Sequence, residues 1–205
     1  MEKNKLLDVV FILDKSGSMG GSEENTITSF NEYLERERKN KYKTRITTIL
    51  FSDEWNYLHK GENVLKVNPI TSEEYYVGGC TALYDALGEG INYIQRKKDK
   101  DKVLFIVITD GYENASRKFN QSKIRKMIKE HGNWEFIYIG ADIDSFAAGS
   151  DIGFKRNNIA SFKKDKKGTS ILFDSIGKAE ACMMGEECLS RSWKEELDEY
   201  IDNNK

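Results

Sequence analysis

Four short segments of the chain are rich in β-branched and aromatic residues, and longer amphipathic segments separate them. The apolar segments cover residues 6–13, 44–51, 102–108 and 134–139. Parallel strands that are covered on both faces have this nearly continuous apolar character, whereas strands with one solvated face alternate. The pattern therefore predicts four buried strands of a mostly parallel sheet.

The segments between these strands carry apolar residues at the spacing of an amphipathic helix. Helices are predicted around residues 27–34, 83–94 and 119–128, and over residues 169–189 near the C-terminus. Strands that alternate with helices form right-handed crossovers, which place helices on both faces of an open sheet.

Two weaker patterns add to this sheet. Residues 53–60 and 64–70 are short, partly alternating and flanked by Gly61 and Pro69, which predicts an antiparallel hairpin that supplies an edge strand. Residues 158–162 predict a last, weak strand. We therefore expect an α/β fold: a doubly wound, Rossmann-like, mostly parallel central sheet with one antiparallel edge strand and helices on both faces.

No repeat, linker or change in composition divides the chain. Its 205 residues fit a single domain over residues 1–205, with a core at about 6–190 and a short polar C-terminal tail. Hydrophobic residues make up 39%, which is too many for a disordered chain. The formal net charge of −2 predicts neither a nucleic-acid partner nor an anionic membrane surface. The apolar runs are also shorter than the ~20 residues that a membrane-spanning helix needs.

The N-terminus and the cysteines predict a cytoplasmic location. Asp8 interrupts the first apolar run, so we expect no signal peptide. Cys80, Cys182 and Cys188 are an odd number without the paired spacing of a disulfide framework or a zinc site. We expect Cys182 and Cys188 to be packing thiols in a reducing compartment.

Oxygen-bearing side chains follow the predicted strands. Asp14, Ser16 and Ser18 lie at alternate positions of a turn after the first strand, Asp110 follows the strand over 102–108, and Thr81 ends a glycine-rich loop. Ligands of open α/β sheets lie at the carboxyl ends of the strands. Carboxylate and hydroxyl oxygens suit Mg²⁺, Mn²⁺ or Ca²⁺ and suit zinc poorly. The sequence therefore predicts a divalent-metal site at this edge.

The order and spacing of these residues resemble the von Willebrand factor type A domain with its metal-ion-dependent adhesion site. The family signature is DxSxS, then a distant Thr, then a distant Asp, and here it reads DKSGS at residues 14–18, Thr81 in GGCTALYDAL and Asp110 in ITDG. The resemblance implies that Ser16, Ser18 and, in the ligand-competent state, Thr81 bind the metal directly. It implies that Asp14 and Asp110 act mostly through water.

The resemblance also implies a function in binding rather than catalysis. Neutral hydroxyl ligands leave the metal most of its charge, so that it can attract a carboxylate of a partner protein. Mg²⁺ suits this role because it retains waters readily, with Mn²⁺ or Ca²⁺ as alternatives. By analogy we expect an intracellular protein partner, such as an ATPase or a multi-subunit complex. Residues expected to select it from their position at the rim are Met19, Gly20, Tyr112, Glu113 and Asn114.

Simpler interpretations compete with the metal site. Asp14 and Ser16 are also residue types that cap helices, and Asp110-Gly111 also suits an ordinary turn. A Mg²⁺-dependent hydrolase or phosphatase on a similar sheet is the alternative function. The haloacid-dehalogenase type, however, needs a second aspartate where Ser16 stands.

Two further enzyme or ligand classes lack their sequence features. Serine catalysis needs a histidine base, and the isolated His59 and His131 are expected at the surface or at a helix end. A glycine-rich turn before a helix also suits phosphate binding, but GxxxxGK[ST] is absent. We therefore expect a non-catalytic binding module.

Overall fold

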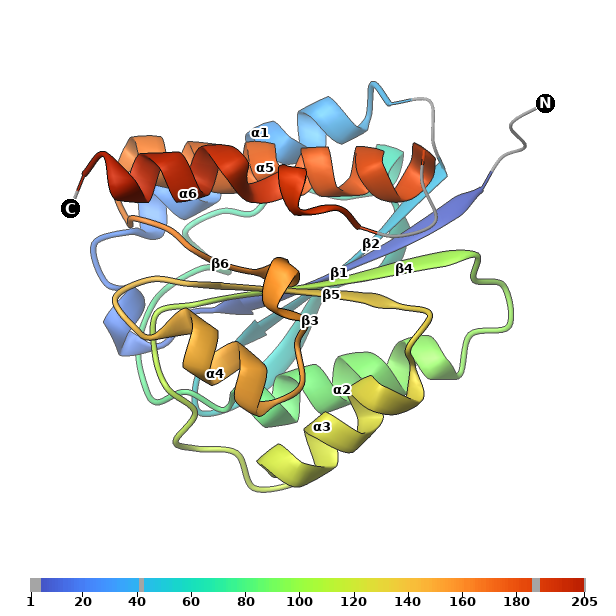
Figure 1. Ribbon diagram of the computed structural model, residues 1–205, viewed down its shortest axis with the longest axis horizontal. Coiled ribbons are helices and arrows are strands. Elements are labelled where there is room, and N and C mark those ends of the chain that lie inside the picture. Colours follow the sequence, from blue (N-terminus) through green and yellow to red (C-terminus); the bar gives the residue numbers. More distant parts are fainter. Residues whose placement is uncertain (1–4, 41–42, 186–188, 205) are drawn as a thin grey trace.

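The computed structural model describes residues 5–40, 43–185 and 189–204, and a six-stranded sheet lies at the centre of this part of the chain (Figure 1). The order of the strands is β3-β2-β1-β4-β5-β6. β3 runs antiparallel to β2, and the other neighbouring strands are parallel. The predicted fold class is therefore confirmed. The strands are β1 (Leu6–Asp14), β2 (Lys43–Phe51), β3 (Trp55–Asn63), β4 (Lys102–Thr109), β5 (Glu135–Gly140) and β6 (Ile159–Ser161).

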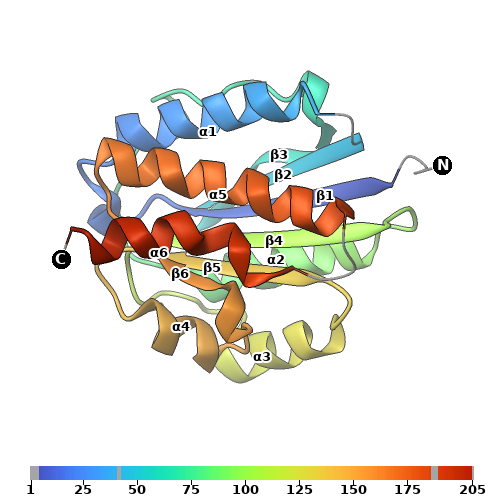
Figure 2. The same ribbon diagram turned by 45° about the horizontal axis from the view of Figure 1, so that its top comes forward.

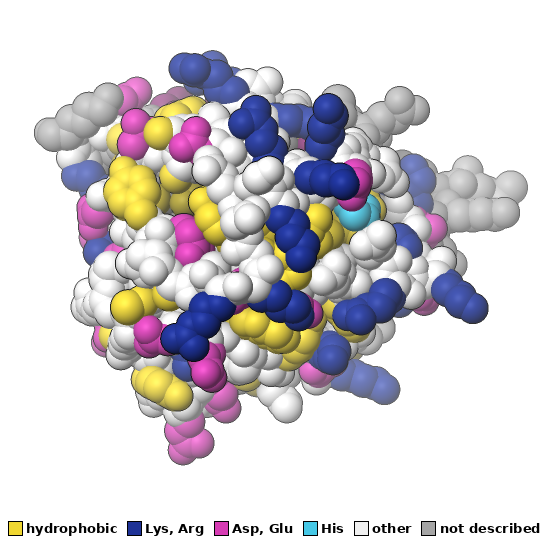
Figure 3. Space-filling model, turned by 90° about the horizontal axis from the view of Figure 1, so that it is seen from below, with side chains coloured by type: hydrophobic (Ala, Val, Ile, Leu, Met, Phe, Trp, Pro, Cys, Tyr) yellow, Lys and Arg dark blue, Asp and Glu magenta, His cyan; other side chains and the backbone are white. Residues whose placement is uncertain are grey.

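Helices cover both faces of the sheet. One face carries α1 (Glu23–Glu37), α5 (Lys166–Gly185) and α6 (Glu195–Asp202), and the other carries α2 (Leu83–Gln95), α3 (Gln121–Glu130) and α4 (Ser145–Asp151) (Figure 1). Figure 2 shows α1 and α5 side by side on the first face. The second face presents charged side chains around small apolar patches (Figure 3). Among the described residues, no helix combines the length and apolar content needed to cross a membrane.

Aromatic rings fill the core on both sides of the central strands. On the first face, the ring centroid of Phe11 in β1 lies 5.1 Å from that of Phe30 and 5.2 Å from that of Tyr33, both in α1. On the second face, Phe105 of β4 stacks on Trp134 and Phe136 at 5.7 and 5.1 Å. Burying one such side chain contributes about 1.5–3 kcal/mol, so these clusters hold β1 and β4 in place at the centre.

The predicted strand over residues 64–70 was wrong. β3 forms its antiparallel pair with β2, and a short 3₁₀ helix, η2 (Val64–Lys66), follows it. The side chain of Asn63 accepts a hydrogen bond from the Leu65 amide at 2.9 Å. The side chain of Asn31 in α1 pairs with both the amide and the carbonyl of Ile70 at 2.8 and 2.9 Å. Side chains thus form the hydrogen bonds that a neighbouring strand would otherwise provide to the Leu65 and Ile70 backbone. The weak strand predicted over 158–162 is confirmed as β6.

The structure adds two helices that the apolar pattern did not predict. Helix α4 is short, and the Asp144 side chain caps it by accepting from the Ala147 amide at 2.9 Å. Helix α6 follows the 3₁₀ helix η4 (Arg191–Lys194). Trp193 and Leu197 are wholly buried in the core on the α5 face, so the apolar core extends beyond the boundary predicted at residue 190.

The two histidines differ in their surroundings. His131 ends α3, as predicted. The surface position predicted for His59 was wrong: the residue is buried in β3, its Nδ1 lies 3.0 Å from Thr48 Oγ1, and its ring stacks on Phe30. Burial lowers the pKa of His59. Among the cysteines, Cys182 is partly buried and packs against the core as expected, and Cys188 lies outside the described residues.

Two glutamates are buried together where α1 and α5 meet. Glu37 and Glu180 are almost fully inaccessible, and the Tyr33 hydroxyl donates to Glu180 Oε1 at 2.5 Å. The Oε2 atom of each has no hydrogen-bond partner among the described residues. Burial, followed by repulsion from Glu37, raises the pKa of Glu180 well above its ordinary value. The folded protein therefore favours the protonated form of Glu180.

Replacing Glu180 with Gln is expected to stabilise the protein at alkaline pH. The folded state retains a proton that the unfolded state releases above the ordinary glutamate pKa, so the wild-type free energy of unfolding falls as pH rises through that range. The amide of Gln needs no added proton. We expect E180Q to exceed wild type by about 1–2 kcal/mol at pH 8 and to match it near pH 4. Urea denaturation across this pH range measures the difference. E73Q, at an exposed loop position, is the control, and a wild-type-like slope for E180Q would contradict the assignment.

Candidate metal centre

Two aspartates leave the sheet where the order of the strands reverses. Asp14 is the last residue of β1, and Asp110 directly follows β4. The parallel register pairs Leu13 with Ile108, so both aspartates emerge at the same edge. The chain continues to β2 and β3 on one side of this point and to β5 and β6 on the other. Such reversals leave a crevice at the carboxyl ends of the strands.

Asp14 is buried, and two hydrogen bonds hold its carboxylate. Oδ1 accepts from the Ser16 amide at 2.7 Å, and Oδ2 accepts from Thr109 Oγ1 at 2.5 Å. The Tyr75 hydroxyl donates to the Asp14 carbonyl at 2.6 Å. Burial raises the pKa of Asp14 to about 6, and the hydrogen bond from Thr109 opposes this rise. These donors come from outside α1, so Asp14 organises the strand edge and does not cap that helix.

The two serines lie in a turn that is tied to a second loop. Ser16 Oγ and Ser18 Oγ are 3.0 Å apart. The Gly17 amide donates to the Gly79 carbonyl at 3.1 Å, which holds the serine turn against the loop that carries Thr81.

Gly79 has a conformation and a position that exclude a side chain. Its φ is +80°, and a Cβ atom there would lie 1.8 Å from Asp53 Oδ2. The Asp53 carboxylate accepts from the neighbouring Cys80 amide at 3.1 Å. Glycine is the residue that tolerates both constraints, so the loop depends on it.

Thr81 and Ser18 converge beside Gly111. The Thr81 amide donates to Asn114 Oδ1 at 2.8 Å, and the Thr81 carbonyl accepts from the Asn114 amide at 3.0 Å. A Cβ atom on Gly111 would lie 2.9 Å from Thr81 Oγ1 and 3.3 Å from Ser18 Oγ. Hydroxyl oxygens from two separate loops therefore surround one small space next to Asp110.

Asp110 directly precedes Gly111, and among the described residues one oxygen of its carboxylate has no donor. Its side chain is fully inaccessible; Oδ2 accepts from the Lys164 ammonium at 2.7 Å. Oδ1 is buried without a hydrogen-bond partner among the described residues. Leaving a buried acceptor unpaired costs about 1–3 kcal/mol, and more when it is charged. A bound cation would remove this cost.

The donor set fits a hard divalent cation. The five residues predicted as ligands lie together, and they offer two carboxylates and three hydroxyls from three loops. The described residues contain no cluster of three or more His, Cys, Asp or Glu, so nitrogen and sulfur ligands for zinc are not assembled here. Oxygen donors of this kind match Mg²⁺, Mn²⁺ or Ca²⁺.

Sequence patterns missed several residues that shape the site. Thr109 immediately precedes Asp110, and its place at the end of a buried strand was the signal that could have found it. Tyr75 and Lys164 reach the site from distant parts of the chain, and no spacing rule connects them to Asp14 or Asp110.

The residues predicted at the rim have different roles. Met19 is buried, so its assignment to the rim was wrong. Glu113 accepts from the Tyr84 and Ser116 amides at 2.9 and 2.7 Å, which fixes the loop after β4. Tyr112 is 56% exposed and remains open to a partner.

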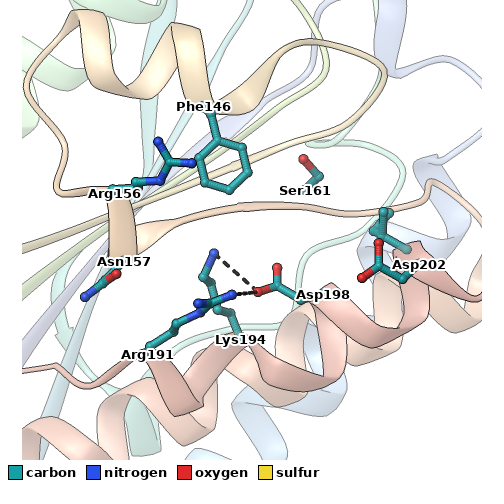
Figure 4. A pocket seen from close by; sticks show the side chains of 9 residues that line it. Phe146, Arg156, Asn157, Ser161, Arg191, Lys194, Asp198 and Asp202 are labelled. Carbon is teal, nitrogen blue, oxygen red and sulfur yellow. Dashed lines mark ion pairs between the residues drawn. The ribbon is translucent and has the colours of Figure 1, made fainter.

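A separate cavity of about 340 Å³ lies along β6 (Figure 4), and its lining includes none of the five predicted metal ligands. Phe146 of α4 and Lys194 of η4 face each other across it, with the Lys194 ammonium 5.0 Å from the ring centroid. Asp198 pairs with Arg191 and Lys194 at 3.5 and 3.4 Å. The third cation of the lining, Arg156, lies 5.6 Å from the Phe146 ring centroid.

The family follows from the sequence comparison. A sequence model of the von Willebrand factor type A domain matches residues 8–171, and the chain belongs to this family. A comparison with the sequences of characterised proteins finds no significant match.

Solved structures share the fold at low sequence identity. The vWF domain of the type V pili tip protein Mfa5 from Porphyromonas gingivalis aligns with a TM-score of 0.66 and 12% identity, over 88% of this chain and 97% of that one. Proximal thread matrix protein 1 from the mussel byssus gives 0.63 and 16%, over 85% and 46%. A D319A mutant of the PilB minor pilin from Streptococcus sanguinis gives 0.64 and 13%, over 87% and 62%. The chain thus spans less than two thirds of the latter two proteins.

Replacing Thr109 with Val is expected to raise the pKa of Asp14 above about 6. Val keeps the shape of the side chain but removes the hydroxyl that donates to Asp14 Oδ2. A hydrogen bond to a charged group contributes about 1.5–3 kcal/mol, so we expect a rise of about one unit. Carbon-detected NMR titration of the aspartate carboxyl groups, with chelator present, measures it. An unchanged Asp14 titration would contradict the role given to Thr109.

Proposed function

We propose that this chain is a non-catalytic protein–protein interaction module whose binding depends on a divalent metal. Asp14, Ser16, Ser18, Thr81 and Asp110 would form its metal-ion-dependent adhesion site, with Mg²⁺ as the preferred ion and Mn²⁺ or Ca²⁺ as alternatives. The partner would supply a carboxylate to the metal.

One observation carries this proposal. The hydroxyls of Ser18 and Thr81 border the space beside Gly111, and the buried Oδ1 of Asp110 has no donor within the described part of the chain. A helix-capping or turn function would not need hydroxyls from two loops around one unpartnered carboxylate oxygen.

The five residues would bind the ion in two ways, through water and directly. Both oxygens of Asp14 already accept hydrogen bonds, which supports its action through water. The hydroxyls of Ser16, Ser18 and Thr81 are neutral, so they would leave the ion most of its positive charge for an incoming carboxylate. The exposed Tyr112 lies two residues beyond Asp110 and would contact the partner beside the ion.

For the partner we propose only a general class, and for the protein a cellular location. Type A domains commonly mediate interactions between proteins, and the structural neighbours include a pilus tip protein and a minor pilin. We propose a subunit of a multi-protein complex as the partner, with an intracellular ATPase as one such case. A cytoplasmic location rests on the odd number of cysteines, of which Cys80 and Cys182 are free thiols.

Replacing Gly111 with Ala is expected to weaken metal binding while the fold remains. The added methyl group would meet Thr81 Oγ1 at 2.9 Å, which displaces a proposed ligand. We expect Mg²⁺ affinity to fall by at least about tenfold, as for other changes beside metal ligands. Titration calorimetry with MgCl₂ measures this change. Gly78→Ala is the matched control, because nothing lies within 4 Å of its added Cβ. Equal affinities for the two variants would contradict the proposed position of the ion.

Partner capture tests the function itself. The immobilised protein is exposed to lysate of the source cell in Mg²⁺ or in EDTA, beside Asp14→Ala, Gly111→Ala and Gly78→Ala. We expect a partner that wild type and G78A retain in Mg²⁺ and that EDTA, D14A and G111A release. Retention in EDTA would contradict metal-dependent binding. Mg²⁺-dependent phosphatase turnover that Asp14→Asn removes would instead favour an enzyme.

A further inference from the structure

The proposed metal site already contains a positive charge that belongs to the chain. The Lys164 ammonium lies 2.7 Å from Asp110 Oδ2, 2.9 Å from Asp142 Oδ2 and 3.1 Å from the Ser18 carbonyl. Lys164 follows β6 and precedes α5. The motif that defines the site ends at Asp110 and gives no role to this lysine.

The loop around Lys164 is held on both sides. Before it, the Phe162 amide donates to the Gly140 carbonyl at 3.0 Å. After it, Asp165 accepts from the Gly168 amide at 2.7 Å and from the Tyr200 hydroxyl at 3.1 Å. These hydrogen bonds fix the backbone on both sides of Lys164 at a position from which its side chain reaches Asp110.

Asp142 offers the ammonium a second position. It has a φ of 54°, which non-glycine residues rarely adopt, and its side chain is 70% exposed, whereas that of Asp110 is inaccessible. The lysine thus bridges one buried and one exposed carboxylate. A shift toward Asp142 would free Asp110 and keep the ammonium paired.

We infer that Lys164 is a built-in cation that competes with the divalent metal for Asp110 and lowers the affinity of the site. This inference rests on the proposed metal site. A divalent ion near Asp110 would lie within a few ångströms of the ammonium, and like charges at this range repel strongly. An ammonium at Oδ2 therefore opposes a divalent ion at Oδ1, and a shift of the ammonium toward Asp142 would relieve this repulsion.

Calorimetric titration with MgCl₂ alone tests the competition. Lys164→Met removes the charge and keeps the length of the stem, and Lys163→Met changes the net charge equally at the adjacent residue, whose ammonium contacts the Asn204 carbonyl instead. We expect K164M to bind Mg²⁺ at least about tenfold more tightly than wild type and K163M to remain within about twofold. Without metal, K164M is expected to melt at a lower temperature, and Mg²⁺ is expected to raise its melting temperature more than that of wild type.

A second variant, at the exposed Asp142, tests the competition without changing a buried residue. Asp142→Asn alters an exposed side chain, and asparagine tolerates a positive φ. Without the Asp142 carboxylate, Lys164 pairs with Asp110 alone, so we expect Mg²⁺ to bind more weakly than to wild type. In the K164M background the same substitution is expected to have a smaller effect.

The possible outcomes distinguish the competition by Lys164 from the proposed metal site itself. Tighter binding by K164M with a wild-type-like K163M supports the competition. Equal binding by wild type, K163M and K164M overturns it and leaves the metal site in place. If Mn²⁺ electron paramagnetic resonance and calorimetry detect no bound ion in any of these proteins at millimolar metal, both the competition and the proposed function are wrong.

Discussion

The burial of two carboxylates at the ends of adjacent parallel strands is the constraint on which the site depends. A charged group removed from water needs donors or a counter-charge. Asp14 obtains its donors from the Ser16 amide and from Thr109, which lies on the neighbouring strand. Asp110 obtains an ammonium at one oxygen, and within the described part of the chain its other oxygen has no donor. The reversal of strand order brings both carboxylates to one edge of the sheet, and their uneven compensation is the basis for proposing a cation there.

Much of this arrangement could be predicted from local pattern. Segments rich in apolar and β-branched residues identified the parallel strands, because strands covered on both faces need little polar surface. The five oxygen donors could be predicted because they occupy fixed places after strands or before a helix. Parallel register then carries Asp14 and Asp110 to one edge. In these cases the regular geometry of parallel strands determines both where the residues occur in the sequence and where they lie in the fold.

The features that sequence reasoning missed depend on contacts without such periodicity. Asn31 satisfies the backbone of Ile70, so a strand-like segment forms no strand. His59 is buried because Phe30 packs on its ring, although an isolated histidine near an edge suggests exposure. Lys164 reaches Asp110 across 54 residues. Each contact joins one side chain to a distant segment, and no regular spacing of residue types along the chain predicts such a contact.

Three other buried carboxylates, Glu37, Glu180 and Asp14, are compensated differently from Asp110. Glu37 and Glu180 face each other between two helices, where protonation of Glu180 lowers the electrostatic cost. Asp14 is satisfied by fixed hydrogen bonds. Neither solution leaves a charged oxygen next to hydroxyls from separate loops. At Asp110 the compensating ammonium belongs to Lys164, whose side chain is one quarter exposed. Asp8 and Glu135 also pair with lysines, so what distinguishes Asp110 is its second, unpartnered oxygen among the described residues together with the neighbouring hydroxyls of Ser18 and Thr81.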